Sequence, residues 1–203
     1  MIELVLASNN EGKVAEFARL LAGLAVRLRR PADFGLSAPE ESGASFVENA
    51  LLKARTAARL TRRPALADDS GLLVEALGGA PGILSARFGG EGLDDRGRVE
   101  CLLRALEGVP APNRRARFHC ALAYVEADED PAPLVATGEW HGLIAEAPRG
   151  SRGFGYDPVF LDPELGRTAA ELSPSEKDQL SHRGRAFARL RPELARRLGM
   201  PVS

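Results

Sequence analysis

Apolar runs alternate along the chain with segments in which apolar residues recur at helical spacing. Residues 2–7 form an apolar run that is followed by a polar stretch and then by Val14, Phe17, Ala18 and Leu21. This pattern predicts a buried parallel strand, a loop and a helix. Further strands are predicted over 25–29, 64–67, 117–125, 134–147 and 159–161. Residues 117–147 are interpreted as a long antiparallel hairpin.

Helix starts are marked by capping residues. Ser45 with Glu48 three residues later forms a capping box and predicts a helix to about Thr61. Asn49 and Lys53 lie four residues apart and therefore share one face of it. Another helix is predicted over 94–107. A helix start is predicted at Ser173-Pro174, and the last helix begins at 181–183.

Length and charge exclude several classes of protein. The 203 residues fit one large domain or two small lobes. A net charge of -1 argues against broad electrostatic capture of nucleic acid. No signal peptide or membrane span is predicted, because the apolar run at 2–7 is too short. Cys101 and Cys120 lack metal-ligand spacing, which indicates a reducing compartment such as the cytoplasm.

Basic residues are strongly biased toward arginine. Only three of the 27 are lysine, namely Lys13, Lys53 and Lys177. A retained lysine can mark a place where a compact ammonium works and a planar guanidinium does not, although chance retention is an equal alternative. The discriminating question is whether all three lysines lie in candidate motifs.

The segment Ala67-Asp68-Asp69-Ser70-Gly71 follows an apolar run that is predicted to end there as a strand. Acids at a strand end suggest a hard cation such as Mg²⁺, which takes oxygen ligands. The alternative is a surface turn, because Asp, Ser and Gly all favour turns. The pentapeptide alone does not separate the two interpretations.

Two other segments are candidates for ligand binding. The polar loop 8–13 precedes a helix, where backbone N–H groups and Lys13 suit phosphate oxygens; the alternative is an ordinary N-cap at Asn10. The glycine-flanked loop 153–158 presents Phe154 and Tyr156, either to stack on a nucleobase or to plug the core. His182 and Arg183 are adjacent donors at a helix start and suit a purine carbonyl oxygen.

Together these motifs resemble the inosine triphosphate pyrophosphatase (HAM1/RdgB-like) family, in the family's order and over nearly the whole chain. The matching segments are 8–13, 46–54, 67–72, 78–82, 153–158 and 181–183. All three lysines lie in motif regions or beside them. Ser8, Leu84 and Phe88 are mild departures that remove no charged group.

The resemblance implies a mixed α/β fold: an elongated central sheet flanked by helices, with two lobes of a single domain (1–203) around a central cleft. It implies Mg²⁺-dependent hydrolysis of purine nucleoside triphosphates (XTP, ITP and dITP) to the monophosphate and pyrophosphate, which clears deaminated purines from the nucleotide pool. It also implies a cytoplasmic homodimer that engages neither a nucleic acid polymer nor a membrane.

The resemblance also assigns roles to residues. Asp69 is the catalytic base that orients or deprotonates the attacking water, and Asp69 with Glu40 or Glu41 holds the metal, with Asp68 in support. Phe154 stacks on the purine, and protein donors that face position 6 donate hydrogen bonds to its keto oxygen. The expected substrate-binding residues are Ser8, Asn9, Asn10, Glu11, Gly12, Lys13, Lys53, Ser70, Phe154, Gly155, Tyr156, Asp157, Lys177, His182 and Arg183.

Two rival functions are a Maf-type nucleotide pyrophosphatase with another base preference and a non-catalytic nucleotide sensor. The base-reading motifs at 154–157 and 181–183 argue against the first. The intact Asp69 and lysines argue against the second.

Overall fold

The structure is a computed structural model that describes residues 2–37 and 41–200. Its strands are β1 (Ile2–Leu6), β2 (Val26–Arg29), β3 (Ala65–Val74), β4 (Arg115–Val125), β5 (Leu134–Ile144), β6 (Phe160–Asp162) and β7 (Arg167–Thr168). Its α-helices are α1 (Glu11–Leu20), α2 (Phe46–Thr61), α3 (Asp95–Ala105), α4 (Pro174–Leu180) and α5 (His182–Arg197).

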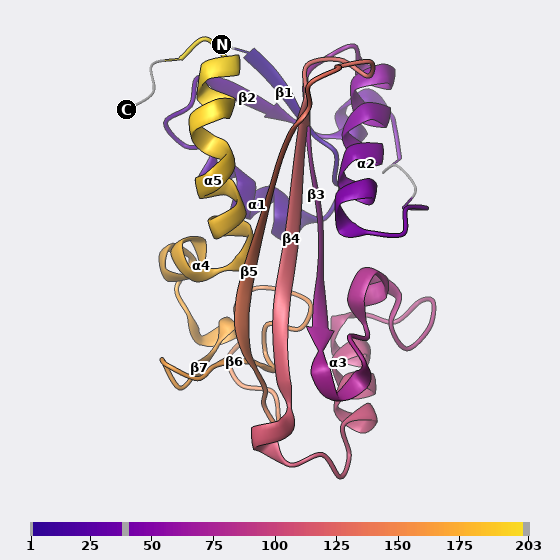
Figure 1. Cartoon of the computed structure of the whole chain (residues 1–203), viewed down its shortest axis with the longest axis vertical. Helices are drawn as coiled ribbons and strands as arrows, with labels where there is room; N and C mark the ends of the chain where they lie inside the picture. Colours follow the sequence, from indigo (N-terminus) through magenta and orange to yellow (C-terminus); the bar gives the residue numbers. More distant parts are fainter. Residues whose placement is uncertain (1, 38–40, 201–203) are drawn as a thin grey trace. The chain divides into compact units, whose positions relative to one another are not determined.

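The strands form one mixed sheet in the order β2-β1-β3-β4-β5-β6-β7 (Figure 1). β1 pairs in parallel with β2 and with β3, whereas β6 pairs antiparallel with β5 and β7. The expected mixed α/β fold with a helix-flanked sheet is therefore confirmed. The parallel strand predicted at the N-terminus is confirmed too.

The chain divides into two compact units. The first comprises 1–69, 120–138 and 183–203, and the second comprises 70–119 and 139–182. The chain passes from one to the other inside β3, β4 and β5 and again at the start of α5. Each unit has a core of its own.

The first unit packs helices on both faces of its strands. On one face, Leu4, Leu66 and Cys120 join an apolar cluster with Phe17 of α1 and Phe187 of α5. The other face is built largely from alanines, which include four residues of α2 and four of its strand partners: Ala50, Ala54, Ala57, Ala58, Ala65, Ala67, Ala121 and Ala123. Because these side chains are small, the backbone of α2 can lie close to the sheet.

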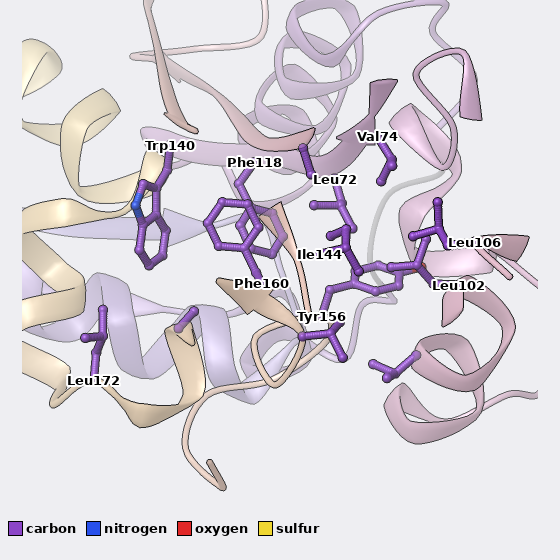
Figure 2. Packing of buried hydrophobic residues seen from close by; sticks show 14 residues of the cluster. Leu72, Val74, Leu102, Leu106, Phe118, Trp140, Ile144, Tyr156, Phe160 and Leu172 are labelled. Atoms are coloured by element: carbon purple, nitrogen blue, oxygen red, sulfur yellow. The ribbon is translucent and has the colours of Figure 1, made fainter. Parts of the chain in front are cut away.

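The second unit has an aromatic core (Figure 2). The rings of Phe118 and Phe160 lie 4.5 Å apart at their centroids, and Trp140 packs on Phe160 at 4.9 Å. Leu102 and Leu106, on α3 and just after it, complete this cluster. The core anchors the loop 153–158 through the buried Tyr156.

The predicted end of the acidic strand was wrong. β3 does not end at the acids but continues to Val74, so the turn interpretation of 67–71 is wrong as well. The register explains the difference: β1 pairs with β3 only at Ala65 and Leu66, so β3 outruns its neighbour just before Asp68. The first helix begins at Glu11, directly after Asn10, which places Lys13 in its first turn.

Within the described residues, no helix is long and apolar enough to cross a membrane.

Candidate active site

Asp68 and Asp69 lie in the first unit where β3 passes the end of β1. Successive residues of a strand point to opposite faces of the sheet. Asp68 therefore meets groups from α1 and α5, and Asp69 meets groups from α2. The two carboxyl groups are almost fully buried, at 1% and 4% exposure, but they lie in different surroundings.

Asp68 is surrounded by donors. Its carboxylate forms an ion pair with Lys13, accepts a hydrogen bond from Nε of Arg183 at 3.1 Å, and accepts another from Sγ of Cys120 at 3.2 Å. Burial alone would raise the pKa of Asp68, but Arg183 and Lys13 hold it well below its ordinary value. Asp68 is therefore an ionised anchor for two cations.

Asp69 has the opposite preference. Its Oδ1 lies 2.8 Å from Nζ of Lys53, and its Oδ2 accepts a hydrogen bond from Nδ2 of Asn49 at 3.2 Å. Burial raises the pKa of Asp69 to about 6; Lys53 opposes this shift, and the nearby charge of Glu41 adds to it. A carboxyl group with this pKa is a far better proton acceptor near neutral pH than an ordinary aspartate.

The helix α2 supplies both partners of Asp69. Asn49 and Lys53 are buried and lie four residues apart, so they share the face that packs on the alanine-rich side of the sheet. Ser45 caps the helix by accepting a hydrogen bond from the Glu48 N–H, as predicted, but the Glu48 carboxylate accepts from the Ala44 N–H and so does not complete the predicted capping box. Asn49 was missing from the predicted site residues, although its spacing from Lys53 was the signal that could have identified it.

Glu41 also reaches Lys53, with 2.6 Å between its Oε1 and Nζ. The carboxylates of Glu41 and Asp69 therefore both contact the ammonium group of Lys53. Burial would raise the pKa of Glu41, but Lys53 lowers it. The alternative metal ligand, Glu40, lies outside the described residues.

Residues 8–13 span the end of the loop after β1 and the first turn of α1. Asn10 caps α1 by accepting a hydrogen bond from the Lys13 N–H at 2.9 Å, and Ser8 accepts one from the Asn10 N–H at 3.2 Å. Asn9 accepts from the Ala32 N–H at 3.4 Å, and Glu11 pairs with Arg30. The N-cap interpretation is therefore confirmed, and the phosphate interpretation stays a prediction that this geometry permits.

Arg183 lies deep in the first unit, at 2% exposure. Its guanidinium bridges Asp68 on β3 and Glu16 on α1, and both acids raise its pKa against the effect of burial. Its contact with a purine edge stays a prediction. Glu16 and Cys120 were not singled out from the sequence, because each is recognisable only through a partner more than fifty positions away.

A second cluster lies in the second unit, around the loop 153–157. Asp157 accepts a hydrogen bond from the Phe154 N–H at 2.9 Å and pairs with Lys177 at 2.5 Å. The ammonium of Lys177 lies 4.9 Å from the centroid of the half-buried Phe154 ring. A cation, a carboxylate and an aromatic face are thus gathered in one place, which suits a planar polar ligand.

The second unit also contains four other residues that were predicted to bind substrate, namely Ser70, Gly155, Tyr156 and His182. Tyr156 is 5% exposed, packs in the aromatic core, and donates its hydroxyl hydrogen to the Ser85 carbonyl at 2.8 Å. His182 stacks on Phe118, with 4.7 Å between ring centroids. Ser70 is half-buried on β3, and Gly155 follows Phe154 in the loop. None of these placements tests a contact with substrate.

The carboxylates of the first unit fit a divalent cation of the magnesium type. No group of three or more His, Cys, Asp or Glu side chains among the described residues is arranged as a complete metal centre. Mg²⁺ does not need one, since it is commonly held by one or two carboxylates together with water and substrate phosphates. Asp69 and Glu41, which converge on Lys53, have the required oxygen chemistry.

Comparison with known proteins gives a consistent result. A dITP/XTP pyrophosphatase of Yersinia pseudotuberculosis is 53% identical over 187 residues, which cover 92% of this chain and 95% of the relative. A dITP/XTP pyrophosphatase of Escherichia coli is 51% identical with the same coverage. The structure of a HAM1 protein from Coxiella burnetii has a TM-score of 0.87 at 48% identity, and the match covers 97% of this chain and all of that one.

The profile of the Ham1 family matches residues 4–193. This span contains every described residue of both clusters. The chain therefore belongs to the Ham1 family.

Proposed function

We propose that the protein is a nucleoside triphosphate pyrophosphatase that hydrolyses dITP, XTP and ITP to the monophosphate and pyrophosphate. The observation that carries the proposal is the environment of Asp69: a buried carboxyl group with a pKa of about 6, placed against Lys53 and beside the Lys13–Asp68 pair. The names of the close relatives support the same activity.

In this proposal, Asp69 accepts a proton from the water molecule that attacks the α-phosphorus. The new bond joins the water oxygen to that phosphorus, and the bond from the α-phosphorus to its bridging oxygen breaks to release pyrophosphate. Lys53 and Lys13 stabilise the negative charge that builds on the phosphate oxygens. Asn49 fixes the orientation of the Asp69 carboxyl group through its hydrogen bond.

Mg²⁺ is proposed as the cofactor, held by Asp69 with Glu41 or Glu40. When bound, it polarises phosphate oxygens and makes its coordinated water more acidic. Asp68 is not proposed as a ligand, since Lys13, Arg183 and Cys120 already engage its oxygens. Its task is to hold Lys13 in place.

The second cluster is proposed to read the base. Phe154 offers an aromatic face for stacking, and Lys177 and His182 offer donors to a keto oxygen. A site that donates hydrogen bonds at position 6 disfavours adenine, whose amino group is itself a donor.

The proposal also includes the oligomeric state and the cellular compartment. The resemblance to the family implies a homodimer in the cytoplasm. Neither Cys101 nor Cys120 forms a disulfide within the described residues, which is compatible with a reducing compartment. Size-exclusion chromatography with light scattering would measure the oligomeric state.

The test is a pyrophosphate-release assay with ITP, XTP, dITP, GTP and ATP, with and without Mg²⁺. We expect turnover of the first three, weak turnover of ATP, and no turnover by Asp69→Asn. Equal rates on ATP and ITP would contradict the base preference. Tight ITP binding without turnover would support a sensor instead, and activity in the presence of EDTA would contradict the metal.

A further inference from the structure

The loop that carries Phe154 is fixed by hydrogen bonds at successive residues. The Phe154 N–H donates to Asp157 at 2.9 Å, and the Tyr156 hydroxyl donates to the Ser85 carbonyl at 2.8 Å. Between them, the Gly155 N–H donates to Oδ2 of Asp95 at 2.7 Å. This last bond comes from α3, sixty positions away in the sequence.

The backbone on both sides of Phe154 has a conformation that needs such support. Gly153 and Gly155 have φ angles of +76° and +60°, in the left-handed region. A Cβ on Gly153 would lie 2.0 Å from Oδ2 of Asp157. Glycine adopts the left-handed conformation without strain but adopts others as readily. The hydrogen bonds of the loop are therefore needed to hold Gly153 and Gly155 in it.

Packing does not fix the loop on the side of α3. A pocket of about 230 Å³ lies there, lined by Asp95 and Val99 of α3 and by Phe154 and Gly155 of the loop, among others. Close-packed neighbours would restrict the loop, but groups that line a pocket have fewer packing contacts on that side. The Asp95–Gly155 hydrogen bond therefore has a larger share in setting the orientation of the loop.

Asp95 has an ordinary explanation that covers only part of its geometry. It is the first residue of α3, where an acid interacts favourably with the helix dipole, and its Oδ1 lies 3.3 Å from Nη1 of Arg98. Neither role requires Oδ2 to accept a hydrogen bond from a distant loop. The side chain is about half exposed, so water could satisfy Oδ2 if the loop did not donate to it.

We propose that Asp95 is a positioning residue for base recognition: by accepting the Gly155 N–H, it holds the loop so that the Phe154 ring is presented to the purine. The inference rests on the proposed function, in which Phe154 stacks on the base. It assigns Asp95 no contact with substrate. Its effect should appear in base-dependent binding and not in binding of the phosphate chain.

The test compares Asp95→Ala, Asp95→Asn and the control Glu100→Ala. Glu100 lies on the same helix and forms an exposed ion pair with Arg96, so its loss perturbs α3 without touching the loop. We expect Asp95→Ala to raise KM for ITP roughly tenfold, as for loss of one hydrogen bond, with little change in kcat. Inhibition by inorganic tripolyphosphate, which lacks a base, should not change.

Asp95→Asn keeps an acceptor oxygen and should restore KM to near the wild-type value. An Asp95→Asn variant as impaired as Asp95→Ala would overturn the proposal, because the helix-dipole charge would then be the relevant feature. A wild-type KM in Asp95→Ala would overturn it too, as would an equal loss of tripolyphosphate inhibition.

A second measurement does not depend on turnover. Amide hydrogen exchange of the peptide that contains 153–157 should accelerate in Asp95→Ala and stay unchanged in Glu100→Ala. Unchanged exchange in Asp95→Ala would overturn the proposal even if catalysis changed. Absence of ITP turnover by the wild-type protein would instead contradict the proposed function, so the two failures are distinguishable.

Discussion

Asp68 and Asp69 are adjacent in the sequence, but their carboxyl groups have opposite protonation preferences. Asp68 has two cationic partners and a pKa well below its ordinary value, whereas burial raises the pKa of Asp69 to about 6. The alternation of side chains along β3 causes the difference, because it directs the two acids to different faces of the sheet. Opposite effects on stability should follow.

Asp69→Asn should stabilise the fold in the absence of metal. The folded protein binds a proton at Asp69 with a pKa of about 6, against 3.8 ordinarily, so ionised Asp69 costs stability as pH rises between these values. A neutral amide avoids this cost. We expect a gain on the order of 1–3 kcal/mol at pH 7.5 in EDTA, which fades below pH 4. Urea unfolding at both pH values would measure it.

The control for this experiment is Glu129→Gln, which removes an exposed acid of the loop between β4 and β5. It should leave the pH dependence of unfolding as it is in the wild-type protein. An Asp69→Asn variant less stable than wild type at pH 7.5 would show that the bond to Lys53 outweighs the burial of the charge.

Asp68→Asn should have the opposite effect. The change removes the shared partner of Lys13 and Arg183 and leaves the buried Arg183 paired with Glu16. Removal of one member of a buried ion pair typically costs about 3–5 kcal/mol. Urea unfolding at pH 7.5 should show a loss of this order, and a loss below about 1 kcal/mol would contradict the anchoring role.

At the scale of elements, the helices were predicted well and the acidic strand was not. Ser45 with Glu48 and Ser173 with Glu176 identify the starts of α2 and α4, because capping is a local interaction. The end of β3 was misplaced because its length depends on β4, a strand distant in sequence. The acids still lie beside the end of β1, so the wrong boundary does not remove them from the edge where the candidate site was predicted.

The close approach of α2 to the sheet gives a prediction at this scale. Ala54 is fully buried in the alanine-rich interface next to Lys53. Ala54→Leu should push the helix outward, cost about 1–3 kcal/mol in stability, and draw Lys53 away from Asp69. Because a shift near 1 Å can strongly slow a reaction, we expect kcat for ITP to fall roughly 10- to 100-fold.

The matched control is Leu60→Ala on the same helix, where the side chain is 52% exposed. It should alter neither stability nor kcat appreciably. If Ala54→Leu loses stability while keeping wild-type kcat, the position of Lys53 is not set by this interface.

At the scale of the whole molecule, the sequence pointed to the candidate site residues but not to the partners that hold them. Lys13, Lys53, Asp69, Phe154 and Lys177 stand in motifs that can be read locally. The buried network around Asp68 could not be read in this way. Glu16 and Arg183 are 167 positions apart, and only the packing of α1 and α5 on one face of the sheet joins them.

Base selectivity should be measurable as a ligand-dependent change in the Tm of the protein. A ligand that binds only the folded state raises stability by about 2.7 kcal/mol at 100 times its Kd. For a chain of this size that corresponds to a rise in Tm of roughly 5–10 °C. IMP should produce such a shift at saturation, because the proposed base site donates hydrogen bonds to its keto oxygen. AMP at the same concentration should produce little shift.

Nucleoside monophosphates are products, so this comparison separates recognition from turnover. Lys177→Met should reduce the IMP shift toward the AMP value, since it removes the ammonium that lies over the Phe154 ring and pairs with Asp157. Its own Tm without ligand sets the baseline for the folding cost of an unpaired Asp157. Equal shifts with IMP and AMP in the wild-type protein would place base selectivity in the chemical step and not in binding.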